Sequence, residues 1–136
     1  MTLAIQQIES YTITIDGTIT AASQLLATVA GAGVDFHAFK AIPVNPNATQ
    51  FTLFAKDSVQ LVNGARKAGI ALAGPHAALL IKGDEEAGAL AGIYAKLALA
   101  GIQVEEACGI ADIHGGYGVV LYLTAEGCSR ALAVLR

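Results

Sequence analysis

The sequence predicts an α+β protein built from two βαββαβ units in tandem. Two observations carry this prediction: an internal repeat, and an order of elements that occurs twice. Asp16 recurs as Asp84 and Gly33 as Gly101, both 68 residues later in a chain of 136 residues. Repeats of this length are duplicated small domains, because a unit of about 70 residues holds a core only marginally and gains stability by packing on a copy.

The first half begins with a strand and a helix. Apolar residues alternate with threonines over 11–15, which predicts a half-buried strand, and Asp16-Gly17-Thr18 turns the chain. Apolar residues at helical spacing over 22–30 predict an amphipathic helix that ends at Gly31 and Gly33. The elements expected next are a strand over 34–42, a loop over 43–47, a strand over 51–55, a helix capped by Asp57 and ended by Gly69, and a strand over 70–73 that stops at Gly74-Pro75.

The second half repeats this order without its last strand. The expected elements are a strand over 77–81, a helix with Leu90, Ile93 and Leu97 on its inner face that ends at Gly101, a strand over 102–113 with a bulge at Gly109, a hairpin turn at Gly115-Gly116, a strand over 119–123 and a helix capped by Thr124. We therefore expect units over 9–74 and 75–136. Residues 2–8 either supply the fourth strand of the second unit or merely extend the first strand.

A βαββαβ unit of this size has a ferredoxin-like fold, an antiparallel sheet with helices on one face. The segment Asp84-Glu-Glu-Ala-Gly88-Ala-Leu90, with Gly101 at the end of its helix, resembles the ACT domain, a small regulatory module of amino-acid metabolism. That family has Asp or Asn, a short turn that usually contains Pro, Gly-x-Leu at the helix start, and Gly before the second strand. The proline is absent here. In the first copy, Thr20 replaces the glycine and Ala22 the leucine.

The resemblance implies a ligand site, because ACT domains bind small molecules, most often amino acids, between paired units. The ligand there lies against the loop after the first strand of one unit and the start of the second strand of its neighbour, and N–H groups at the helix N-terminus receive its carboxylate. By position, the candidate ligand-binding residues are Asp16, Gly17, Thr18, Thr20, Asp35, Asp84, Ala87, Gly88, Ala89, Leu90 and Gln103. Asp35 is the candidate for a ligand amine. We expect one dominant site per chain, at the turn that contains Gly88, although the acidic residues 84–86 count against an anion there.

Composition limits the other partners. Eight basic residues against eleven acidic ones give a net charge of −3, and aromatic residues are 6% of the chain, which argues against nucleic-acid binding. No apolar run reaches the roughly 18 residues of a membrane helix. We expect a cytoplasmic protein with reduced thiols and neither an export signal nor a membrane partner. Charged residues are only 14% of the chain, which favours association of subunits.

Few residues suggest catalysis or metal binding. His37, His76 and His114 lack metal-ligand spacing, and Cys108 and Cys128 are expected to be small core residues. We expect no cofactor and no enzymatic activity, so a regulatory output needs a protein target. The alternatives are a structural dimerisation module with a decayed ligand site, and a small enzyme in which Asp35, His37 and Tyr117 are the first candidates. A homodimer is expected, in which a second chain covers a sheet face that carries His37, Phe39, Thr52 and Phe54.

Overall fold

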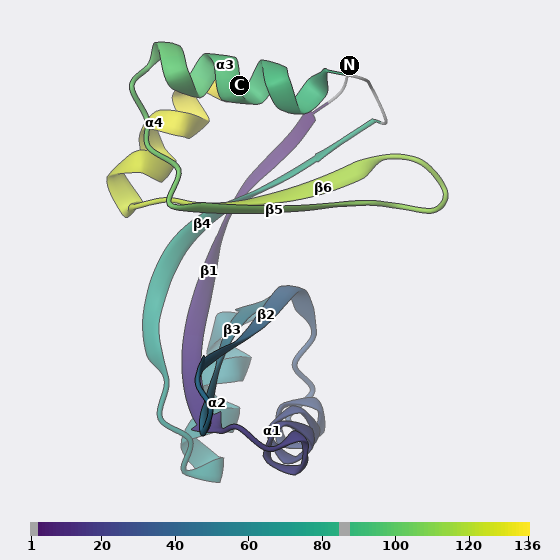
Figure 1. The fold of residues 1–136 in the computed structure, drawn as a ribbon, viewed down its shortest axis with the longest axis vertical. Helices are drawn as coiled ribbons and strands as arrows, with labels where there is room; N and C mark the ends of the chain where they lie inside the picture. The colour runs from purple at the N-terminus through teal and green to yellow at the C-terminus, as the bar shows by residue number, and fades with distance from the viewer. Residues whose placement is uncertain (1–2, 85–87) are drawn as a thin grey trace. The chain divides into compact units, whose positions relative to one another are not determined.

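The computed structural model describes residues 3–84 and 88–136, which form strands and helices in a ferredoxin-like order (Figure 1). The elements are β1 (Leu3–Asp16), α1 (Ile19–Gly31), β2 (Phe36–Asn45), β3 (Ala48–Ala55), α2 (Ser58–Ala68), β4 (Ala73–Gly83), α3 (Ala89–Leu99), β5 (Glu106–Ala111), β6 (Tyr117–Tyr122) and α4 (Ala125–Leu135). The strand order in the sheet is β2-β3-β1-β4-β6-β5. The pairs β1–β3, β2–β3, β4–β6 and β5–β6 are antiparallel.

The chain divides into two compact units. One is Glu9–Pro75, and the other combines the N-terminal segment through Ile8 with His76–Arg136. Strands β1 and β4 each run from one unit into the other. The protein is therefore α+β, with helices and antiparallel strands in both units.

The core of the Glu9–Pro75 unit lies between its strands and the helix pair α1 and α2, which pack against each other. Its clustered buried apolar side chains alternate along the strands and recur at helical spacing along the helices. They are Ile13, Leu25, Val29, Val34, Phe51, Leu53, Ala55 and Leu61.

The second unit buries an equivalent cluster. Figure 1 shows α3 and α4 on one side of the β5–β6 hairpin, and the two helices pack together. The cluster is Leu79, Ile81, Ile93, Leu97, Ile102, Val119, Leu121, Leu123, Cys128, Ala131 and Leu135. Leu3 and Ile5 of the N-terminal segment pack against it.

Positions related by the repeat behave alike. Leu25 and Ile93 are both buried, as are Val34 and Ile102. The helix-ending glycine of each half has a positive φ, +79° at Gly33 and +67° at Gly101, a conformation that favours glycine. The helix caps also follow the sequence, because Asp57 accepts a hydrogen bond from the Gln60 N–H and Thr124 from the Gly127 N–H.

Several predicted boundaries are wrong. Strand β4 runs through Gly74-Pro75, where a strand was predicted to stop. Residues 3–8 are continuous with the strand predicted over 11–15, as one of the two alternatives for this segment has it, and together they form β1. Residues 70–72 were predicted as strand but precede β4, and Ile70 and Leu72 pack against the core of the first unit. Residues 43–45, predicted as loop, belong to β2. Pro43 is tolerated because an edge strand does not need every N–H for pairing.

The strand predicted over 102–113 is shorter than its apolar content suggested. Only Glu106–Ala111 pair with β6, because Ile102 turns into the core, where its N–H donates to the Leu97 carbonyl at the end of α3. The register through Gly109 is continuous, so the predicted bulge there is wrong. Leu90 is 51% exposed rather than on the inner face of α3, where Ala89 is buried instead.

Two predictions about exposure are also wrong. Cys108 is exposed on β5, whereas Cys128 is buried as expected. The predicted apolar sheet face does not exist as one surface, because a register shift between Phe36 and Ala38 places Phe39 opposite Leu53 and Ala38 opposite Phe54. Thr52 and Phe54 are buried within the chain itself.

Candidate functional site

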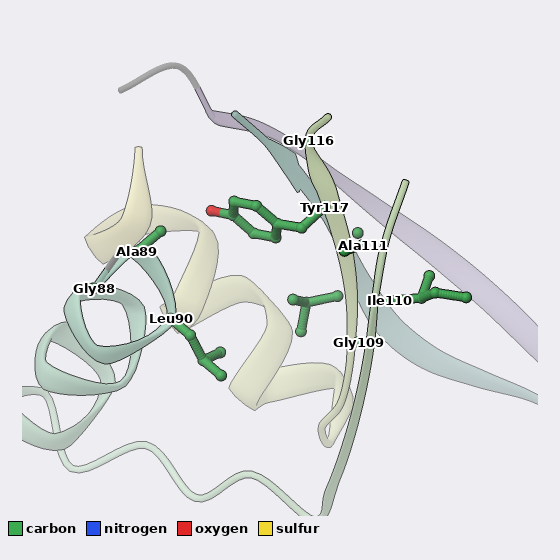
Figure 2. A pocket seen from close by; sticks show the side chains of 10 residues that line it. Gly88, Ala89, Leu90, Gly109, Ile110, Ala111, Gly116 and Tyr117 are labelled. Atoms are coloured by element: carbon green, nitrogen blue, oxygen red, sulfur yellow. The ribbon is translucent and has the colours of Figure 1, made fainter. Parts of the chain in front are cut away.

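The unit that contains His76–Arg136 has an open pocket of about 800 Å³ between the start of α3 and the β5–β6 hairpin (Figure 2). Its lining comes from three short segments of the chain. These are Gly88, Ala89 and Leu90 at the helix, Gly109, Ile110 and Ala111 on β5, and Gly116, Tyr117, Gly118 and Val119 on β6. The volume is that of a site for a small organic molecule.

The helix wall of the pocket is the N-terminus of α3. Gly88 is its N-cap residue with a φ of +87°, and no side chain among the described residues caps the helix there. The first N–H groups of a helix have no partner within the helix, and they carry a partial positive charge. Figure 2 shows Leu90 extending from this first turn into the space between the helix and the hairpin.

The hairpin wall is made of small residues. Gly109 and Ala111 alternate with Ile110 along β5, so they share a face, and Figure 2 shows the Ile110 side chain pointing away from α3. A Cβ at Gly109 would lie 3.3 Å from the Gly118 carbonyl oxygen. The pocket exists because β5 presents hydrogen and methyl groups where larger side chains would fill the space under the helix.

Tyr117 is the polar side chain of the described lining. It pairs with Gly83 across β4 and β6, and Figure 2 shows it extending from β6 toward Ala89. Its hydroxyl is buried and has no hydrogen-bond partner in the described chain. A buried polar atom without a partner costs free energy. Since the hydroxyl has no accessible surface, it is the ring of Tyr117 that forms this part of the pocket wall.

The corresponding turn in the first half is closed by its own side chains. Asp16 Oδ1 accepts a hydrogen bond of 2.9 Å from the Thr18 N–H, and Thr18 Oγ1 accepts one of 3.1 Å from the Ala21 N–H. The Gly17 N–H donates to the Asn47 carbonyl. Thr20 lies exposed in the first turn of α1. A ligand at this helix would compete with the Thr18 cap, unlike a ligand at α3.

The remaining predicted residues are spread over the chain. Gly88, Ala89 and Leu90 are brought together in the pocket, and Ala87 lies outside the described residues. Asp84 is exposed after β4 and is not part of the lining. Asp35 and Gln103 are both exposed and precede β2 and β5, and the Asp35 carbonyl accepts from the Lys56 N–H.

Sequence reasoning missed the hairpin half of the pocket. The candidate residues include Tyr117 only as a possible catalytic residue. They omit the rest of this wall, which is Gly109, Ile110, Ala111, Gly116, Gly118 and Val119. The signal was the glycine-rich stretch His114-Gly-Gly-Tyr-Gly118, which was correctly assigned to a hairpin turn. The same glycines also open space beside the strands.

Titratable groups lie mostly away from the pocket. Burial and the nearby negative charges of Glu106 and Cys108 raise the pKa of Tyr122 to about 12, and Glu106 is its cross-strand neighbour. Burial, and secondarily Glu105, raises the pKa of the Cys128 thiol. Within residues 3–84 and 88–136, no three His, Cys, Asp or Glu side chains gather closely enough to hold a metal ion. Nor does any described helix have the length and apolarity needed to cross a membrane.

Comparison with known proteins gives no family match and no curated relative. Solved structures match over nearly the whole chain. BT0572 of Bacteroides thetaiotaomicron superposes with a TM-score of 0.80 at 15% identity, over 95% of this chain and 88% of that one. The ligand-free regulatory subunit of aspartate kinase from Thermus thermophilus gives 0.67 at 18% identity, over 99% and 95%. The same subunit from Thermus flavus gives 0.57 at 17% identity, over 98% and 94%.

The chain has the fold of an aspartate kinase regulatory subunit. The ACT resemblance found in the sequence is thereby confirmed at the level of the fold, as is the α+β class. Two of these three similar structures are regulatory subunits rather than catalytic ones.

Proposed function

We propose that this protein is a non-catalytic regulatory protein that binds a small molecule in the pocket between α3 and the β5–β6 hairpin. The observation that carries the proposal is the pocket itself, in which the N-terminus of α3, which no described side chain caps, and the ring of Tyr117 lie beside small residues. The likeness to regulatory subunits supports the same class of function. The ACT resemblance makes amino acids the first ligands to test.

We also propose that each compact unit is one ACT-like domain, arranged in tandem. The first would be residues 9–74, and the second 75–136 with its fourth strand supplied by residues 2–8. Support comes from Leu3 and Ile5, which pack against the core of the second unit, and from the strand order, in which β1 lies beside β4. The first turn, Asp16–Thr20, would then be a second, weaker site, because Thr18 already caps its helix.

The proposed assembly is a cytoplasmic homodimer that acts on a protein target. Strand β2 lies at one end of the strand order and exposes Phe39, Ile42 and Val44, which supports association of two chains. A binding function is favoured over catalysis by the pocket chemistry. Among the described lining residues Tyr117 is the one titratable side chain, so they offer no acid–base pair.

Thermal unfolding against the twenty amino acids and common nucleotides tests the proposal. A ligand that binds only the folded chain stabilises it by about 2.7 kcal/mol at a hundredfold excess over its Kd. Ala111→Leu should abolish that shift, because Ala111 is exposed on the pocket wall and a larger side chain there fills the space. Ala107→Leu is the matched control, since Ala107 lies on the same face of β5 but outside the lining.

The outcomes separate the proposal from its rivals. A saturable shift that Ala111→Leu removes and Ala107→Leu retains supports a ligand site in the pocket. A shift that both variants retain, and that Thr20→Val removes, would place the site at the first turn. No shift with any compound would favour a structural module with a decayed site.

A further inference from the structure

The outer edge of β5 is open along the whole strand. β5 is the last strand in the sheet order of the described chain, and all of its residues, Glu106–Ala111, are exposed. We propose that this edge binds an extended, basic segment of another protein, which adds to the sheet as a further strand beside β5. The inference goes beyond the proposed small-molecule site, because it concerns the strand edge next to that pocket and the partner that the edge takes.

The backbone groups at this edge belong to three residues with small side chains. In an antiparallel ladder, alternate residues exchange hydrogen bonds with the neighbouring strand, and the residues between them direct their N–H and C=O groups away from it. Asp112, directly after β5, donates its N–H to the Gly116 carbonyl of the β6 side, and the register runs back from there through β5 without a shift. The even-numbered residues of β5 therefore pair with β6. Ala107, Gly109 and Ala111 present their N–H and C=O groups to the outer edge.

The pocket lies directly beside this edge. Gly109 and Ala111 form part of its wall, opposite Leu90 of α3, and β5 is the end strand. An added strand would place alternate side chains on the α3 side, next to the pocket. Its other side chains would lie beside Ile110, which is 80% exposed and points away from the helix in Figure 2. Main-chain hydrogen bonds would supply affinity, and the pocket and Ile110 would favour apolar side chains in the segment.

The charge around the edge is acidic, which determines the chemistry of the partner. Glu105 and Glu106 at the start of β5 and Asp112 at its end are all exposed. The sequence has no lysine or arginine between Lys96 and Arg130. A segment with Lys or Arg at both ends would therefore meet carboxylates at both ends of β5. Such complementarity raises the rate of association and weakens as salt is added.

The same charges disfavour a second copy of β5 at this edge. Two β5 strands related by a twofold axis would pair antiparallel. Pairing centred on Gly109 would place Glu106 opposite Asp112 of the second copy at both ends of the ladder, and like charges directly opposite each other are destabilising. A basic segment forms the same main-chain hydrogen bonds without this repulsion.

Fluorescence anisotropy with labelled peptides tests the inference. The probe is the peptide Lys-Thr-Val-Thr-Leu-Thr-Val-Lys with both termini blocked, in which apolar side chains alternate with threonines between two lysines. We expect saturable binding to the wild-type protein. Replacing both lysines by glutamates should weaken it about tenfold at low ionic strength, and by much less in about 1 M salt, where exposed charges are screened.

N-methylation of the peptide tests the pairing without changing the protein. Two forms, each N-methylated at alternate residues, lose N–H groups on opposite edges of the extended chain. Only one edge of an added strand faces β5. One form should therefore keep its affinity, and the other should lose about tenfold or more through blocked hydrogen bonds.

Ala107→Pro tests the edge in the protein. Proline removes the outward N–H of Ala107 but no hydrogen bond to β6, and an edge strand tolerates it there. Ala107 also lies outside the pocket lining, so the pocket should stay intact. Peptide binding should weaken about tenfold or more in Ala107→Pro and persist in Ala107→Val, which keeps the N–H. Circular dichroism confirms that both variants fold.

Each failure has a separate meaning. Absence of peptide binding, or binding that both N-methylated forms and Ala107→Pro retain, overturns the docking edge, while the proposed small-molecule function stands or falls on its own thermal shifts. Equal affinity of the lysine and glutamate peptides overturns the basic partner. A wild-type dimer that Ala107→Pro dissociates would assign the edge to a second copy and overturn the inference.

Discussion

The Tyr117 ring lies directly against the backbone of Gly83, so that a Cβ at position 83 would come within 2.7 Å of the Tyr117 hydroxyl oxygen. The two residues are cross-strand neighbours on β6 and β4. An aromatic ring over a strand glycine covers backbone that would otherwise lack packing. The contact also fixes the position of the Tyr117 ring at the wall of the pocket.

Gly83→Ala should therefore destabilise the protein by about 1–3 kcal/mol, because the methyl group forces the Tyr117 ring out of its position. Urea unfolding measures this cost. In a Tyr117→Ala background the same substitution should cost much less, since the ring that it meets is gone. Additive costs in the double variant would show that Gly83 matters for another reason than the ring.

Tyr117→Phe should not destabilise the ligand-free protein, and should stabilise it by up to about 1 kcal/mol. The hydroxyl is buried without a partner in the described chain, so its removal ends a desolvation cost and breaks no hydrogen bond that the structure shows. Differential scanning calorimetry gives the change in Tm. Tyr94→Phe controls for the substitution itself, because Tyr94 is 40% exposed. A clear loss of stability in Tyr117→Phe alone would mean that the hydroxyl has a partner.

The cap of α1 predicts a difference between two neighbouring threonines that can be measured. Thr18→Ala should cost about 1 kcal/mol, because Thr18 Oγ1 accepts from the Ala21 N–H, whereas Thr20→Ala should change little at an exposed position. Chemical denaturation of both variants gives the comparison. Equal costs would contradict the view that Thr18 alone closes this turn.

The sequence predicts the fold well because the fold depends on periodic burial. Asp57, Gly69 and Thr124 end or begin helices through local chemistry that needs no tertiary information. Strand lengths were predicted less well, because pairing depends on partners far away in the chain. Ile102 and Ile70 have strand-like side chains, yet both turn into a core beside a helix end.

The candidate site shows the same division. Gly88 and Leu90 were found because the turn motif is local, whereas Gly109 and Ala111 carry no chemistry that a sequence reveals. Their contribution is an absence of side-chain volume, which becomes visible only when the opposite wall is known. The register shift in β2, which separates Phe39 from Phe54, likewise depends on the pairing with β3.

Stability should fall at alkaline pH in a way that Tyr122 controls. Its pKa in the folded protein is raised to about 12 from an ordinary value of 10.0, mainly by burial, so the folded state holds this proton more tightly than the unfolded state. The resulting stability is fully present below pH 10 and is lost as the pH rises from about 10 to about 12.

Tyr122→Phe should flatten this part of the unfolding free-energy profile. The raised pKa of the Cys128 thiol acts in the same direction, so Cys128→Ala in both backgrounds separates the two contributions.

Self-association should depend on the edge strand β2. This strand lies at one end of the strand order, and Phe39 is 60% exposed, with Val44 at 52% further along the strand. An exposed apolar edge pairs readily with another strand, and charged side chains are what usually prevents this. Phe39→Glu should therefore shift the protein from dimer toward monomer in sedimentation equilibrium at micromolar concentration.

Because the Phe39 side chain is exposed, the variant should fold like the wild type. The two proteins should have the same circular dichroism spectrum and, at concentrations where both are monomeric, the same Tm. Leu99→Glu, at a 90% exposed position of α3, is the control for added charge. A wild-type protein that sediments as a monomer would rule out the homodimer, and a dimer unaffected by Phe39→Glu would place its interface on another surface.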